Sequence, residues 1–136
     1  MVKVTAAGGV IHCKQADKEQ VLLIYRNGLW DLPKGKKEKD ESIATCARRE
    51  VAEETGIPLP EIEAFLTKTR HQYEREGILH DKTTHWFAMY SNATDAFTPQ
   101  KSEGIEIVQW VGLEGALKKV GYANLREVLK AFRQRV

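Results

Sequence analysis

Three carboxylates crowd one turn of a predicted helix inside the stretch from Gly35 to Ile57. Glu50, Glu53 and Glu54 stand close enough to repel one another, and like charges at helical spacing cost about 0.2–0.5 kcal/mol per pair. A chain that keeps such a turn needs a cation among the carboxylates, and hard divalent ions take oxygen ligands. The turn therefore predicts a divalent metal site on a helix.

The position of these carboxylates around the helix supports a metal rather than a solvated surface. At about 100° per residue, Ile43, Ala47 and Val51 form an apolar arc, and Glu50 and Glu54 lie within or beside it. A surface helix keeps its carboxylates on the far side, and buried charges need partners or a metal. The alternative is an acidic face in solvent that pairs with neighbouring arginines, which are Arg48 and Arg49.

The sequence predicts both ends of this helix. Ser42, preceded by Asp40 and Glu41, predicts the N-terminal cap, and Gly56 followed by Pro58 predicts the stop. The segment Leu32–Lys36 before the helix is predicted to be a loop.

The spacing of residues in this segment resembles the Nudix box. The matching positions are Gly35, Glu41, Arg49-Glu50-Val51, Glu53-Glu54 and Gly56-Ile57. Flanking segments are also similar to this family, namely Ala6–Ile11, Trp30–Gly35, and Glu103 with Trp110. The resemblance implies an α/β fold, a Nudix-type α/β/α sandwich with a mixed central sheet, formed by one domain over residues 1–136.

The same resemblance implies a hydrolase that cleaves the pyrophosphate linkage of a nucleoside diphosphate joined to another group. It implies Mg²⁺, with Mn²⁺ as a substitute, bound by Glu50 and Glu54, by Glu53 directly or through water, and by the backbone carbonyl near Lys34 or Gly35. Phosphoryl transfer to water needs neutralised oxygens and an aligned water.

The catalytic residues implied by the resemblance include a general base that is not fixed by the motif. Glu50 or Glu53 is favoured as the base, and Glu103 is the candidate from a later loop, with Glu106 a weaker alternative. Arg49 would orient a carboxylate of the box, and Glu41 would support it.

Substrate identity depends on residues outside the box. Polyphosphate needs cations and a base needs a stacking surface. The candidate cations are Arg26, Lys34, Arg70, His71, Lys82 and His85, and of these Arg26, Lys34 and Lys82 are the predicted phosphate-binding residues. Strand alternation sends Trp86 and Phe87 to opposite faces, so one of them, with Trp86 as the candidate, faces the substrate. The segment around Lys82 is similar to the dinucleoside polyphosphate branch, which makes those compounds the leading substrates. Modified nucleoside triphosphates are the alternative substrates, and a non-catalytic nucleotide-binding module is the alternative class.

The amino-acid composition is compatible with a globular enzyme of this kind. Hydrophobic residues make up 42% and charged residues 29%, as in soluble globular proteins, and a net charge of +2 argues against bulk nucleic-acid binding. Cys13 and Cys46 are read as small buried residues without a disulfide. We expect a cytoplasmic protein without a signal peptide or membrane span, acting on small nucleotides as a monomer or homodimer.

The remaining segments alternate between strands and helices. Strands are expected at 2–13, 21–25, 62–73, 82–91 and 105–111, and helices at 113–120 and 123–135. Asn27-Gly28 predicts a turn, and the charged segment Glu74–Asp81 is expected to be a loop.

Overall fold

A mixed sheet of seven strands forms the centre of the computed structural model, which describes residues 1–91 and 96–135. The strands are β1 (Val2–Gln15), β2 (Lys18–Arg26), β3 (Leu29–Asp31), β4 (Lys34–Lys36), β5 (Glu61–Arg75), β6 (Ile78–Tyr90) and β7 (Ile105–Gly112). The helical elements are α1 (Ile43–Thr55), η1 (Lys101–Glu103), α2 (Leu113–Lys119) and α3 (Ala123–Arg135).

The strand order is β3-β2-β1-β6-β5, with β4 paired to β1 and β7 paired to β2. β1 runs parallel to β6 but antiparallel to β2 and β4, so the sheet is mixed as expected. A parallel pair needs a long crossover between its strands, and the segment that holds α1 is part of that crossover.

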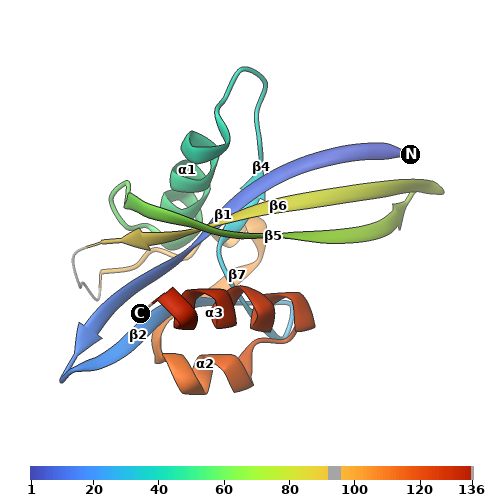
Figure 1. Cartoon of the computed structure of the whole chain (residues 1–136). Coiled ribbons are helices and arrows are strands. Elements are labelled where there is room, and N and C mark those ends of the chain that lie inside the picture. The colour runs from blue at the N-terminus through green and yellow to red at the C-terminus, as the bar shows by residue number, and fades with distance from the viewer. Residues whose placement is uncertain (92–95, 136) are drawn as a thin grey trace.

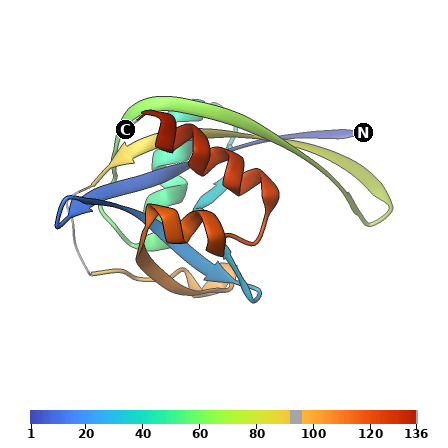
Figure 2. The ribbon, with the colours of Figure 1, turned by 60° about the horizontal axis from the view of Figure 1, so that its bottom comes forward.

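Helices cover both faces of the sheet (Figures 1 and 2). On one face α1 buries Ala47 and Val51 against Ile11 of β1. On the other face α3 buries Val128 and Phe132 in a second cluster with side chains of β1 and β6. The two clusters confirm the expected α/β/α sandwich.

Tight turns of two residues join the first strands. Ala16-Asp17 and Asn27-Gly28 all have positive φ, between 51° and 76°, which matches the turn that connects twisted antiparallel strands. The predicted Asn27-Gly28 turn is confirmed. β1 and β2 both extend beyond their predicted limits because pairing between them continues to Gln15 and Lys18.

The expectation that Glu74–Asp81 forms a loop is wrong. β5 and β6 pair through Arg75 and Ile78, and the turn is confined to Glu76-Gly77, both at positive φ. Charged side chains are compatible with strand here because the hairpin and the start of β1 extend beyond the helices (Figure 1). Long-range pairing therefore overrides the polar composition of this segment.

Two short strands, β3 and β4, were not predicted, and β4 replaces the last three residues of the expected loop at Leu32–Lys36. β4 pairs with β1 at Ala6↔Lys36, Ala7↔Gly35 and Gly8↔Lys34. The pairing fixes the segment that precedes α1 against the centre of the sheet.

Cys13 and Cys46 are buried and free, as expected from the sequence. Within residues 1–91 and 96–135, no helix combines the length and the apolar character needed to cross a bilayer.

Candidate active site

The carboxylate helix α1 has the ends that the sequence predicts. The Ser42 side chain accepts a hydrogen bond from the backbone N–H of Thr45, and Gly56 ends the helix at a φ of 81°. The backbone N–H groups of Thr98 and Gln100 donate to the carbonyls of Thr55 and Glu54 at 2.9 and 3.3 Å. The late loop is thereby attached to the C-terminal end of α1.

Glu54 is the most buried of the three carboxylates, with 3% of its surface exposed. Its Oε1 accepts a hydrogen bond from the backbone N–H of Lys34 at 3.0 Å, and its Oε2 accepts one from Arg26 at 3.3 Å. Burial raises the pKa of Glu54 to about 7, although Arg26 and the Lys34 N–H both favour the charged form. The neighbouring cations therefore offset only part of the free-energy cost of burying the charged Glu54 carboxylate.

Glu50 packs directly against Gly35. A Cβ built on Gly35 would lie 2.0–2.3 Å from the carboxylate carbon and oxygens of Glu50, so only glycine leaves room for this carboxylate. Burial raises the pKa of Glu50, and the charges of Glu53 and Glu103 act in the same direction against Arg49. Glu103 is exposed in η1, close enough for its charge to act on Glu50.

Arg49 connects the carboxylates. Its guanidinium donates to Glu41 at 2.6 and 3.0 Å, to Glu50 at 3.1 Å and to Glu53 at 3.2 Å. Hydrogen bonds from Arg49 lower the pKa of Glu41 to about 2, and Glu41 in turn raises the pKa of Arg49. The Arg49 guanidinium also donates to the backbone carbonyl of Lys36 at 3.1 Å, which attaches this network to β4.

The alternative interpretation, an acidic helix face in solvent, does not describe α1. Glu53 is half-exposed, with 44% of its side chain accessible, but the Glu50 and Glu54 side chains are 14% and 4% accessible. This burial confirms the placement of Glu50 and Glu54 beside the apolar arc of α1.

The donor set fits a hard divalent cation. Glu50, Glu53 and Glu54 project from one turn, and burial raises the pKa of both Glu50 and Glu54 despite the nearby arginines. In the arrangement described for residues 1–91 and 96–135, no three His, Cys, Asp or Glu side chains already converge on one point. The Gly35 carbonyl accepts a contact from the Cys46 thiol at 3.6 Å. In this arrangement the carboxylates of Glu50 and Glu53 accept hydrogen bonds from Arg49.

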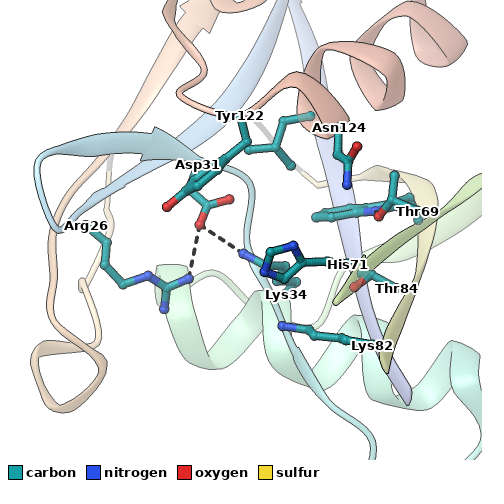
Figure 3. A pocket seen from close by; sticks show the side chains of 11 residues that line it. Arg26, Asp31, Lys34, Thr69, His71, Lys82, Thr84, Tyr122 and Asn124 are labelled. Atoms are coloured by element: carbon teal, nitrogen blue, oxygen red, sulfur yellow. Dashed lines mark hydrogen bonds and ion pairs between the residues drawn. The ribbon is translucent and has the colours of Figure 1, made fainter. Parts of the chain in front are cut away.

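A pocket of about 270 Å³ lies beside the carboxylates of α1 (Figure 3). Strand residues form one wall and the start of α3 forms another. Its lining consists of Arg26, Asp31, Lys34, Thr69, His71, Lys82, Thr84, Trp86, Tyr122, Asn124 and Leu125. Figure 3 shows Lys34, His71 and Lys82 pointing into the same space.

Asp31 organises two of the cations in this pocket. Its Oδ2 pairs with Arg26 at 3.2 Å and with Lys34 at 2.9 Å, and its Oδ1 accepts the Leu32 N–H at 2.8 Å. Lys82 has a pKa lowered to about 8, first by burial and then by the charges of Lys34 and Lys36. The pocket thus holds a concentration of positive charge suited to phosphate.

Trp86 forms part of the pocket wall with only 1% of its surface exposed, and its indole N–H donates to Thr69 Oγ1 at 2.9 Å. Phe87 lies on the opposite face and makes an edge contact with Phe65. The predicted separation of the two aromatic residues is therefore confirmed.

Sequence reasoning missed several pocket residues, namely Asp31, Thr69, Thr84 and Asn124, and gave no weight to Tyr122 as a pocket residue. Asp31 lies in the segment Trp30–Gly35 that resembles the family, but no role was predicted for it. His71 was considered only as one of several possible cations, because nothing in the sequence places β5 beside α3.

The chain was compared with known proteins. The family model described as NUDIX domain matches residues 4–132. Nudix hydrolase 21, chloroplastic, from Arabidopsis thaliana is 33% identical over 101 residues, which cover 74% of this chain and 48% of that protein. Putative mutator protein MutT4 from Mycobacterium tuberculosis is 32% identical over 102 residues, which cover 74% of this chain and 39% of that protein. The chain therefore spans about half the length of these curated relatives, or less.

Among solved structures, the C. elegans Ap4A hydrolase binary complex is similar with a TM-score of 0.73 at 27% identity. The match covers 97% of this chain and 96% of that one. The likeness therefore extends over the sheet and over the helices on both of its faces.

Proposed function

Because the chain belongs to the family of proteins with a NUDIX domain, we propose that it hydrolyses the pyrophosphate linkage of a nucleoside diphosphate joined to another group, with a divalent cation. The observation that carries this proposal is the position of Lys34. Its backbone N–H donates to Glu54 at 3.0 Å, and its ammonium pairs with Asp31 in the cation-lined pocket at 2.9 Å. One residue therefore joins the carboxylate cluster to the pocket.

Glu50, Glu53 and Glu54, with the Gly35 carbonyl, would hold Mg²⁺ or Mn²⁺. When bound, the cation supplies positive charge to the phosphate oxygens that become more negative during cleavage. Arg49 would orient the box carboxylates to which it donates. Glu41 holds Arg49 in place by accepting two hydrogen bonds from it. Arg26, Lys34 and Lys82 bind the phosphates from the pocket side.

The proton of the attacking water goes to a carboxylate. Glu53 is the most accessible of the three carboxylates of α1, burial raises the pKa of Glu50, and the charge of Glu103 in η1 acts on Glu50. We propose Glu50 or Glu53 as the base, with Glu103 acting electrostatically on Glu50.

Dinucleoside polyphosphates are the leading substrates. The cation-lined pocket supports this choice, as does the similarity to a protein described as an Ap4A hydrolase. Trp86 would contribute to this site as a buried wall of the pocket. Modified nucleoside triphosphates are the second candidate, favoured by the similarity to a putative mutator protein.

The proposal extends to partners and location. The partner is a small nucleotide, the protein acts as a monomer or homodimer, and no nucleic acid is required. We propose the cytoplasm as the location, since both cysteines are buried free thiols.

A product-resolved hydrolysis screen tests this function. The purified chain is incubated with Mg²⁺ and dinucleoside polyphosphates, modified nucleoside triphosphates or nucleoside diphosphate sugars, and the products are separated by chromatography. We expect turnover that falls about 10²-fold or more in Glu53→Gln and Glu54→Gln but not in Glu127→Gln, an exposed glutamate of α3. Nucleotide binding without turnover of any compound would instead support a non-catalytic module.

A further inference from the structure

The outer edge of β5 has no neighbouring strand within residues 1–91 and 96–135. β5 is the last strand in the order β3-β2-β1-β6-β5, so it pairs with another strand only on its β6 side. Long, regular edge strands can pair with a further chain, and proteins protect them with bulges or covering helices. The first half of β5 has both forms of protection. Two register shifts interrupt it before Thr67, and Arg135 of α3 pairs with its Glu63 at 3.7 Å.

The second half of β5 is regular and uncovered. From Thr67 to Arg75 the strand pairs with β6 without a register shift. Figure 1 shows this part of the β5–β6 hairpin extending beyond the helices. Ile78 and Leu79, at the start of β6, are 50% and 44% exposed. This half of β5 therefore offers a straight edge beside exposed apolar side chains.

Backbone groups of this half are available for pairing. Among the described residues, Asn124 of α3 is the only group outside the hairpin that donates to this backbone, at 3.3 Å to the Arg70 carbonyl. That contact indicates that the Arg70 carbonyl can be reached from outside the hairpin, and a carbonyl oxygen can accept two hydrogen bonds. Alternate residues of an antiparallel strand direct their backbone groups to the same edge, so Gln72 and Glu74 present theirs beside Arg70.

The charges of this half change sign at Gln72. Lys68 and Arg70 precede it, Glu74 and Glu76 follow it, and all four are exposed. When two copies pair antiparallel about Gln72, Arg70 of one copy lies opposite Glu74 of the other, and Lys68 lies opposite Glu76. Opposite charges directly across an antiparallel pair stabilise it, whereas like charges destabilise it. The segment is therefore complementary to itself in this register.

Aromatic rings meet in the same register. Tyr73 stacks on His71 at 5.5 Å and on His80 at 5.0 Å between ring centroids. Pairing about Gln72 places His71 opposite the partner subunit's Tyr73, on the same face of the joined sheet. His71 also lines the cation-lined pocket, and Figure 3 shows it pointing into that space. The partner's ring would therefore lie beside the pocket wall.

We propose that the chain forms a homodimer in which Thr69–Arg75 of β5 pairs antiparallel with the same segment of a second copy, about a two-fold axis at Gln72. The interface is isologous, because the same surface of each copy contacts the other. Strand addition at an exposed sheet edge supplies backbone hydrogen bonds, and the charges fix the register. This assembly does not depend on the proposed hydrolysis.

A single cysteine tests the register. Gln72 lies opposite itself in this dimer, and paired residues of an antiparallel ladder have Cα atoms about 4.5–5.5 Å apart, within the range of a disulfide. We expect Gln72→Cys to give a disulfide-linked dimer on a non-reducing gel after mild oxidation. Glu61→Cys, in the interrupted half of β5, is the matched control and stays monomeric on the gel. The wild type does so as well, since Cys13 and Cys46 are buried.

Sedimentation equilibrium measures the association without a cross-link. We expect the wild type to dimerise with a dissociation constant of about 10 µM or below. Glu74→Lys places lysine opposite the partner's Arg70 and should weaken the dimer about tenfold, whereas Glu61→Lys should leave it unchanged. Gln72→Pro removes an outward N–H and should give a monomer. Melting curves check folding, and Glu74→Lys decides the result if Gln72→Pro does not fold.

Two results would overturn this assembly. One is a wild type that stays monomeric at about 100 µM. The other is a dimer in which Gln72→Cys cross-links no more than Glu61→Cys, or in which Glu74→Lys and Glu61→Lys associate equally well. Hydrolysis by a monomeric chain would leave the proposed function intact and remove only the dimer, whereas a dimer that hydrolyses nothing would remove only the proposed function.

Discussion

The carboxylate of Glu50 occupies the space beside Gly35 in which any other residue would place its Cβ, with the nearest atom at 2.0 Å. Gly35 belongs to β4, and Glu50 belongs to α1, so the contact joins the strand and the helix that contribute the candidate metal ligands. The glycine is required for close approach of a side chain, rather than for a turn.

Gly35→Ala should therefore affect the site more than the fold. The inserted Cβ displaces the flexible end of Glu50, which costs little stability but moves a proposed ligand. A displacement of about 1 Å can cost about 10²-fold in rate. We expect kcat/KM to fall by about that factor while the melting temperature changes little.

Gly115→Ala in α2 is the matched control for this variant. Its Cβ would meet Val111 at an ordinary 3.8 Å, and alanine in a helix is favoured over glycine by about 1 kcal/mol. Activity should be unchanged and stability should rise. Full activity in Gly35→Ala would show that the position of Glu50 is not critical.

Lys82 should make stability depend on alkaline pH. Its pKa in the folded protein is about 8, below the ordinary 10.5, because burial and the neighbouring lysines disfavour its charge. Between these values the unfolded chain binds more protons than the folded chain, so the free energy of unfolding rises with pH across this window. The rise should be present in the wild type and absent in Lys82→Met, as measured by urea unfolding from pH 7.5 to pH 10.5. Parallel pH profiles for the two proteins would contradict this prediction.

Thr69 should stabilise the pocket wall through Trp86. In Thr69→Val the buried indole N–H loses its acceptor, which costs about 1–3 kcal/mol. The control is Thr67→Val, because the Thr67 hydroxyl makes only a 3.4 Å contact with the Lys68 carbonyl in an exposed region, and the expected change is within about 0.5 kcal/mol. Urea unfolding measures both values. Equal losses would indicate that replacing a hydroxyl by a methyl group on β5, and not loss of the hydrogen bond to Trp86, determines stability.

The carboxylate helix could be predicted because its determinants are local. The apolar arc of α1, the Ser42 cap and the Gly56 stop all depend on residues within a few turns of one another. The same local pattern identified Glu50 and Glu54 as partly buried, which the structure confirms.

The substrate pocket could be predicted only in part, since it depends on contacts between distant segments. Asp31, His71 and Asn124 come from β3, β5 and α3, and only the pairing of the sheet brings them together. The hairpin at Glu76-Gly77 was missed for a related reason. Charged residues are disfavoured in isolated strands, but pairing of β5 with β6 along their full length outweighs that preference.

Metal binding by the carboxylates of α1 is the central claim, and titration of Mg²⁺ and Mn²⁺ into the wild type and the Glu50→Gln/Glu54→Gln variant tests it most directly. A cation at about 100 times its dissociation constant should stabilise the wild type by about 2.7 kcal/mol, visible as a higher melting temperature. The double variant should fold but show neither binding heat nor this stabilisation. The same heat and the same stabilisation in both proteins would place the cation elsewhere and contradict the account.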